Sequence, residues 1–217
     1  MLDHTWLILD FLRNLSPSLI GFLSGIIMTL TGRILYDIWR GPKISAYPSS
    51  NDPSVAEHIT PHYAFYHIII KNERKRLWLT INPVLYARIT IIFRDKSGRE
   101  LFRIPAKWDF RPEPLINYKE KVVDPSLISQ CEVLDINPGS EESFCICIKQ
   151  DGEDAIYGFN AYSYLHPFCK NPKWKLDKGE YYVDIVLKAA NAYKEFHFTL
   201  RNNGPRFRDV ELKLAHQ

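Results

Sequence analysis

The 217-residue sequence lacks several features on which common enzymes and nucleotide-binding folds depend. It has only 10 glycines and no G-x-G-x-x-G, P-loop, G-x-S-x-G or EF-hand motif. The four cysteines include no C-x-x-C pair, and a net charge of +3 is too small a surplus to indicate nucleic acid as a partner. We therefore predict a protein that is not an enzyme and needs no cofactor.

The histidines also lack the spacing of a metal site. His58 and His62 are four apart, but Pro61 between them disrupts the helix that would bring them together. His166 and Cys169 are near each other only in sequence, whereas catalytic groups normally assemble in space. We predict no metal site and no catalytic residue.

Charge is absent from one long run near the N-terminus. The 19 residues from Asn14 to Gly32 carry no charged side chain. In a helix rising ~1.5 Å per residue this run covers ~28 Å, close to the ~30 Å hydrocarbon core of a bilayer. Ser16-Pro17 suits a helix start, and Gly41-Pro42 cannot continue a helix. These features predict a transmembrane anchor over residues 16–40. The alternative is a buried helix of a soluble bundle, but no second helix of comparable apolarity follows.

The residues on either side of this run predict two further segments. Residues 1–15 resemble a short interfacial helix. Trp6 and Trp39 are 33 positions apart, or ~50 Å in one straight helix, which is too long for both to mark the boundaries of one span. Residues 41–60 are rich in proline and serine and predict a linker that contains at most one early strand.

Small residues recur along the predicted anchor at three- and four-residue spacing. Such a stripe lets two helix backbones approach closely in lipid. It predicts a helix–helix contact, and hence a homodimer, through Ser18, Gly21, Gly25, Thr29 and Gly32.

The orientation of the chain follows from the bases that flank the run. Arg13 stands alone before it, whereas Arg33, Arg40 and Lys43 follow. This bias favours a C-terminal domain in the cytoplasm. The cysteines do not form the evenly spaced framework of a secreted domain, which agrees with a reducing compartment. Cys145 and Cys147, two apart on a predicted strand, are expected to point the same way. We predict a single-pass protein of the cell membrane.

Residues 61–217 predict one mainly β domain. Aromatic and β-branched alternation indicates strands separated by turn residues, which is typical of an antiparallel β-sandwich. The predicted strands are His62–Lys71, Leu77–Ile81, Arg88–Phe93, Glu100–Ile104, Glu142–Lys149, Tyr181–Ala189 and Phe196–Leu200.

The segment Leu176–Val183 resembles the tyrosine corner of immunoglobulin-like and fibronectin-like sandwiches. The resemblance implies that Asp177 and Gly179 shape a turn, and that the Tyr181 hydroxyl bonds to upstream backbone. Val183 stands where antibody domains carry a cysteine, so the inter-sheet disulfide is missing. The predicted fold class is an immunoglobulin-like antiparallel β-sandwich preceded by an N-terminal transmembrane α-helix.

Taken whole, the chain is similar to a loose group of uncharacterised prokaryotic single-pass membrane proteins. The similarity rests on Leu19–Thr31, on the basic exit Arg40-Gly41-Pro42-Lys43 and on Leu176–Val183. It implies a membrane anchor and a β-domain, and no activity comes with it.

Aromatic residues concentrate in a loop, residues 151–175, between two predicted strands. Eight aromatics fall within the 26 positions from Tyr157 to Tyr182. Long loops in compact domains are usually functional, and aromatic side chains are enriched in binding sites. The alternative is that the loop forms a satellite core over its own domain. The candidate binding residues of the loop are Tyr157, Phe159, Asn160, Tyr162, Tyr164 and Trp174.

A second irregular segment, residues 105–114, mixes aromatic, basic and proline residues. In an extended chain, Trp108 and Phe110 would share one face, with Lys107 and Arg111 on the other. If it lay beside the aromatic loop, the two would form an amphipathic recognition surface.

Two functions fit these observations. The first is a membrane-anchored interaction protein that touches membrane lipid and binds a protein, or a second copy of itself, through the aromatic loop. The second is a ligand-gated membrane effector that binds a small molecule such as a nucleotide second messenger, with aromatics stacking on a base and Lys107 or Arg111 meeting phosphate. An enclosed pocket would favour the second, and a flat exposed patch the first.

Overall fold

The computed structural model describes residues 17–49, 54–56, 62–74, 82–117 and 122–215. The chain divides into two compact units, residues 1–41 and 42–217.

The helices are α2 (Pro17–Arg40), α3 (Pro125–Ile128) and the 3₁₀ helices η1 (Ser129–Glu132), η2 (Ala161–Leu165), η3 (Pro167–Cys169), η4 (Pro172–Trp174) and η5 (Phe207–Asp209). The strands are β1 (Ile44–Pro48), β2 (Ser54–Ala56), β3 (Tyr63–Asn72), β4 (Val84–Arg94), β5 (Glu100–Pro105), β6 (Leu115–Asn117), β7 (Val122–Val123), β8 (Leu134–Ile136), β9 (Glu141–Gln150), β10 (Ile156–Gly158), β11 (Lys175–Leu176), β12 (Gly179–Ala189), β13 (Ala192–Asn202) and β14 (Val210–Leu214).

Helix α2 occupies most of the first unit. It begins at Pro17, where the missing N–H of proline costs nothing, and ends at Arg40 before Gly41-Pro42. Among the residues that the structure describes, no helix combines the length and apolarity needed to cross a bilayer. The transmembrane character predicted for residues 16–40 is therefore not confirmed. The interfacial helix predicted for residues 1–15 lies outside the described residues.

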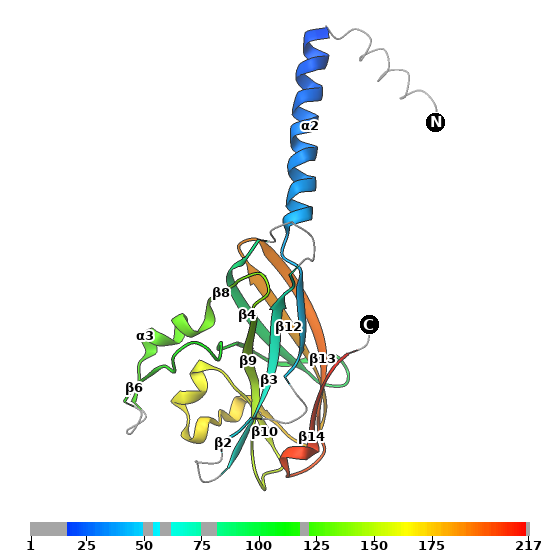
Figure 1. Cartoon of the computed structure of the whole chain (residues 1–217). Helices are drawn as coiled ribbons and strands as arrows, with labels where there is room; N and C mark the ends of the chain where they lie inside the picture. The colour runs from blue at the N-terminus through cyan, green and yellow to red at the C-terminus, as the bar shows by residue number, and fades with distance from the viewer. Residues whose placement is uncertain (1–16, 50–53, 57–61, 75–81, 118–121, 216–217) are drawn as a thin grey trace. The chain divides into compact units, whose positions relative to one another are not determined.

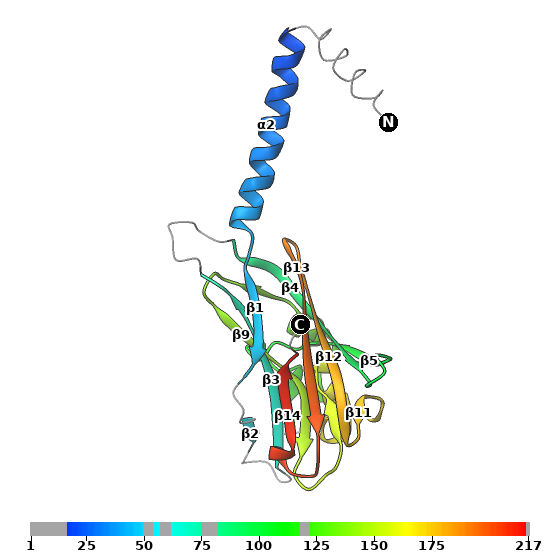
Figure 2. The same ribbon diagram turned by 90° about the vertical axis from the view of Figure 1, so that its right-hand side faces the viewer.

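The second unit is mainly β and its strand pairs are antiparallel, as predicted. The first sheet has the order β1-β3-β9-β10-β11, with β2 also pairing with β3. The second has the order β14-β13-β12-β4-β5, with β8 also pairing with β4 (Figures 1 and 2). Strands β1 and β2 lie within residues 41–60, so part of the predicted linker belongs to the first sheet. The strand predicted at Leu77–Ile81 lies outside the described residues.

The two sheets share one hydrophobic core. Alternation along β3 turns Tyr66, Ile68 and Ile70 inward, where they join side chains of β4, β12 and β13 in a single cluster. Each fully buried isoleucine contributes about 1.5–3 kcal/mol relative to an exposed one. The central residues of this core are Ile68, Ile70, Ile89, Ile91, Phe93, Phe144, Ile146, Val183, Ile185, Leu187, Phe198 and Leu200.

Strand β9 contains a bulge that separates its two cysteines. Its pairing with β3 moves from Cys147 opposite Tyr66 to Cys145 opposite His67, so Ile146 is the extra residue. Cys147 therefore joins the core shared by the sheets, and Cys145 joins a cluster on the other face of the first sheet. The expectation that both thiols point the same way is wrong, because the bulge changes the alternation. All four cysteines are free thiols.

The turn before β12 is closed by Tyr181. Its hydroxyl donates a hydrogen bond to the carbonyl oxygen of Asp177 at 3.0 Å. The same carbonyl accepts from the Asn202 side chain at 3.2 Å. The hydrogen bond predicted from the Leu176–Val183 segment is confirmed.

Candidate functional site

The outer face of the first sheet is covered by two parts of the described chain, the stretches 105–117 and 122–133 on one side and residues 159–174 on the other. Figure 1 shows α3 and the short helices that follow β10 beside β9 and β3, on the side away from β12. Side chains from the sheet and from the second segment form a cluster there, which consists of Tyr63, Phe65, Cys145, Ile148, Ala155, Tyr157, Phe159, Tyr164 and Cys169. Three of the six aromatics of the predicted loop, Tyr157, Phe159 and Tyr164, thus belong to a satellite core, the alternative considered for the loop.

The predicted loop residues divide into buried and exposed groups. Phe159 packs edge-on against both Phe65 and Tyr164, with ring centroids 5.6 and 5.7 Å away. The Tyr157 hydroxyl donates to Glu153, and burial together with this carboxylate raises the pKa of Tyr157 to about 12. Asn160 is buried and caps η2, and Trp174 is half-buried against the core. Of the predicted loop residues, Tyr162 alone is well exposed.

Residues 105–114 do not form the extended strip that the sequence suggested. The backbone N–H of Arg111 donates to the carbonyl of Trp108, which closes a turn. Trp108 is fully buried against Phe144, and its indole N–H donates to the carbonyl of Glu132 at 3.1 Å. Phe110 is 84% exposed. The expectation that these two rings share one face is wrong, because the turn places them in opposite environments.

The two bases of this segment hold its backbone together. The ammonium group of Lys107 is buried and donates to the carbonyls of Trp108 and Arg111, at 3.4 and 3.2 Å. The Arg111 guanidinium donates through Nε to the carbonyl of Val133 at 3.0 Å. Both side chains, expected to share the face opposite the two rings, thus bind carbonyl groups of the protein.

The two segments do meet, as the recognition-surface hypothesis requires. The Tyr164 hydroxyl hydrogen-bonds to Glu113, and burial is the main reason that the pKa of Tyr164 is raised. Cys131 lies between the segments, because its thiol donates to the carbonyl of Pro112 while its side chain packs with Ala161. Residues 105–114 and 159–174 therefore form one layer over the first sheet.

This layer exposes an apolar ridge, defined here as Tyr162, Leu165 and Phe168. The three side chains are 41, 53 and 61% exposed and follow one another at three-residue intervals. Phe168 has φ 56°, a conformation that is costly for a bulky side chain. Sequence reasoning missed Leu165 and Phe168. The signal that could have found them is the i, i+3 apolar spacing across η2 and η3.

A polar cluster lies on the same face of the sheet. Asp109 accepts a hydrogen bond from the Ser143 hydroxyl at 2.7 Å, and its Oδ2 lies 3.5 Å from Nε2 of His67. Burial lowers the pKa of His67, although Asp109 opposes the shift. The serine donates to the carboxylate rather than to the imidazole, so this is not the geometry of an activated nucleophile. In the described part of the chain, no group of three or more His, Cys, Asp or Glu side chains could hold a metal ion.

The small residues of α2 line a shallow groove. Gly21, Gly25 and Thr29 border it together with larger apolar neighbours, and the Thr29 hydroxyl donates to the carbonyl of Gly25 at 2.7 Å. A Cβ atom added at Gly21, Gly25 or Gly32 would meet nothing within 4 Å. The helix–helix contact predicted for this stripe stays a prediction.

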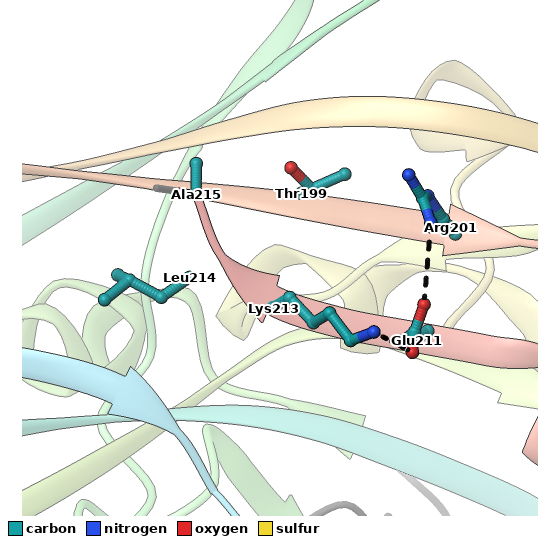
Figure 3. A pocket seen from close by; sticks show the side chains of 6 residues that line it. All are labelled: Thr199, Arg201, Glu211, Lys213, Leu214 and Ala215. Carbon is teal, nitrogen blue, oxygen red and sulfur yellow. Dashed lines mark ion pairs between the residues drawn. The ribbon is translucent and has the colours of Figure 1, made fainter. Parts of the chain in front are cut away.

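Another pocket, of about 190 Å³, lies on β13 and β14 (Figure 3). Arg201 and Lys213 both pair with Glu211 there, at 4.0 and 2.5 Å, and Arg201 also pairs with Glu180. Its charges therefore compensate one another. The residues that line it are Thr199, Arg201, Glu211, Lys213, Leu214 and Ala215, none of which was predicted for binding.

Comparison of this chain with protein-family models, with curated proteins and with solved structures found no match. Its class therefore follows from the structure alone. The described residues form a mainly β domain of antiparallel sheets that follows an apolar helix in the chain.

Proposed function

We propose that the protein is a membrane-attached binding protein. In this proposal α2 associates with a lipid bilayer, and the β-domain presents the apolar ridge to a protein partner. The observation that carries the proposal is the exposure of large apolar side chains along α2. Apolar surface of this extent is unfavourable in water and marks a lipid or protein contact. The exposed residues are Leu19, Phe22, Leu23, Ile26, Ile27, Met28, Leu30, Ile34 and Leu35.

The arrangement of these side chains favours lipid over a protein cover. At about 100° per residue, they spread over roughly two thirds of the helix circumference. A helix that packs on one protein surface needs an apolar stripe only somewhat wider than ~100°. The remaining third carries the small residues, including Gly21 and Gly25. Lipid therefore accounts for the wide apolar arc, and the small residues leave room for a second copy of α2.

The ridge is suited to a protein partner. Aromatic and aliphatic side chains supply contact area at low entropic cost, and Phe168 keeps an exposed ring despite its strained backbone. We propose no nucleotide ligand, because Trp108, Tyr157 and Phe159 are buried and Lys107 binds carbonyl groups.

We also propose a fold class for the β-domain and the side of the membrane on which it lies. We infer that the two sheets form an immunoglobulin-like sandwich, which the shared core and the Tyr181–Asp177 hydrogen bond support. We infer a cytoplasmic β-domain from the bases that follow the charge-free run and from the four free thiols.

Vesicle flotation of the full chain tests the membrane attachment. The native protein is expected to float with phosphatidylcholine vesicles, and Ile26→Asp/Ile27→Asp to remain at the bottom of the gradient. Leu101→Asp is the matched control, because Leu101 is an exposed apolar residue of β5, and it is expected to float. Failure of the native protein to float would overturn the proposal.

Photo-crosslinking in cells tests the partner. With benzoylphenylalanine in place of Phe168, we expect an adduct of defined mass that is missing when the probe replaces Tyr182, an exposed tyrosine of β12. An adduct at twice the chain mass would show that a second copy occupies the ridge. No adduct at Phe168 would remove the ridge from the proposal.

A further inference from the structure

The start of β4 exposes two neighbouring apolar side chains, one of which has a strained backbone. Its pairing with β8 passes from Val84 to Ala87, so Leu85 and Tyr86 lie in a bulge. Tyr86 has φ 55° and is 68% exposed, and Leu85 is also exposed. A left-handed backbone is costly for a bulky residue and persists only where the surroundings hold it.

The surroundings of this bulge hold it from two sides. The carboxylate of Asp135 accepts from the backbone N–H of Tyr86 at 2.7 Å. The Asn191 side chain accepts from the N–H of Leu85 at 3.1 Å and donates to the carbonyl of Pro83 at 2.7 Å. The backbone N–H of Ala190 also donates to the carbonyl of Leu85. These hydrogen bonds therefore fix the bulge in the conformation that exposes Leu85 and Tyr86.

A second exposed tyrosine lies on the hairpin that holds the bulge. Tyr193 is 57% exposed and stands opposite Lys188, which itself pairs with Arg88 two residues after Tyr86. Figures 1 and 2 show the β12–β13 turn at the end of the β-domain where β1 begins. We call Leu85, Tyr86 and Tyr193 the apolar rim.

The rim belongs to the end of the domain that is tethered to α2. Three residues, 41–43, separate Arg40 from Ile44, the first residue of β1. Tyrosine is enriched where membrane proteins meet the water interface, because one end of its ring is apolar and the other polar.

We infer that the apolar rim is a second membrane contact, in which Leu85, Tyr86 and Tyr193 lie in the interfacial region of the bilayer that α2 enters. The inference rests on the proposed membrane attachment. It assigns a function to the strained bulge.

Photo-crosslinking of the full chain in phosphatidylcholine vesicles tests this contact separately from the attachment. Benzoylphenylalanine is placed in turn at Ile27, Tyr86, Tyr193 and Tyr182, and lipid adducts are detected by mass spectrometry. We expect adducts at Ile27, Tyr86 and Tyr193 and none at Tyr182. Adducts at Ile27 alone would overturn the rim contact and leave the attachment standing. No adduct at Ile27 would overturn the attachment, and equal yield at Tyr182 would show that the rim is not special.

The variant Tyr86→Gly distinguishes a role of Tyr86 in lipid contact from a role in stabilising the fold. Glycine adopts φ 55° without a Cβ penalty, so the thermal midpoint is expected to be unchanged or raised. The variant is expected to bind vesicles more weakly than the native protein while it stays attached through α2, whereas Tyr182→Ser is expected to bind as the native protein does. A lowered thermal midpoint with unchanged vesicle affinity would show that Tyr86 serves the fold and would overturn the inference.

Discussion

The hydroxyl of Tyr181 donates to the carbonyl oxygen of Asp177, four residues earlier, at a distance of 3.0 Å. The bond closes the turn that leads into β12. Asn202 donates to the same carbonyl, and its side-chain oxygen accepts from the buried ammonium group of Lys149 at 3.1 Å. One backbone oxygen thus ties the entry of β12 to β13 and β9, the latter in the opposite sheet.

Removal of this hydroxyl is expected to destabilise the domain modestly. Because Asn202 still satisfies the Asp177 carbonyl, Tyr181→Phe should lower the free energy of unfolding by about 0.5–1.5 kcal/mol. Urea denaturation should show a lower midpoint with an unchanged m-value. Tyr182→Phe, at an exposed position on the same strand, is the control and should leave the midpoint unchanged. Equal effects of the two variants would contradict a specific role for the Tyr181 hydroxyl.

Trp108 and Phe110 are expected to respond oppositely to truncation. Trp108→Ala opens a cavity against Phe144 and should cost about 3–5 kcal/mol of stability. Phe110→Ala, at an exposed ring, should change stability by less than about 0.5 kcal/mol. Thermal unfolding of both proteins measures the difference. A large loss from Phe110→Ala would show that this ring is part of the fold.

The side chain of Phe168, the ridge residue with a strained backbone, should be dispensable for folding. Because Phe168 has φ 56°, Phe168→Gly is expected to keep or raise the free energy of unfolding. The same substitution should abolish the partner adduct formed by a probe at Leu165. Phe168→Ala, which keeps the backbone strain but removes the ring, should also abolish it. Retention of the adduct in both variants would exclude Phe168 from the contact.

His67 should make the domain sensitive to mild acid. Burial lowers the pKa of His67 in the folded state below its unfolded value of about 6.5, with Lys107 adding to the shift and Asp109 opposing it. Below about pH 6.5 the unfolded chain binds more protons at this histidine than the folded chain does. The contribution of the neutral His67 to the free energy of unfolding is therefore fully present above about pH 6.5 and is lost as the pH falls through the folded-state pKa. Urea unfolding at pH 7.5 and 5.5 should show a smaller difference for His67→Gln than for the native protein. The exposed His62→Gln should behave as the native protein does, and an unchanged difference in His67→Gln would contradict the assignment.

The strands in which apolar and polar residues alternate could be predicted from the sequence. Strands β3, β4, β5, β9, β12 and β13 coincide with predicted segments, because each turns one apolar face to a shared core. The Tyr181 turn could be predicted because its contact is local. Short strands such as β10 and β11 escaped prediction, since two or three residues carry no periodic signal.

The candidate site was harder to predict because non-local contacts decide which of its side chains are buried and which are exposed. Composition correctly marked residues 151–175 as unusual, but it could not show which rings face Phe65 and which face solvent. The turn at Trp108 and the bulge at Ile146 each reverse the side on which a residue falls, and neither leaves a glycine or a motif in the sequence. The strain at Tyr86 and Phe168 is visible only in backbone angles.

We propose above all that α2 attaches the protein to a membrane. The most direct test is to express the native full chain, isolate the membranes and wash them with alkaline carbonate, which strips proteins held only by charge. We expect the native chain to stay in the membrane pellet and Ile26→Asp/Ile27→Asp to move to the supernatant. Recovery of the native chain in the soluble fraction before any wash would contradict it.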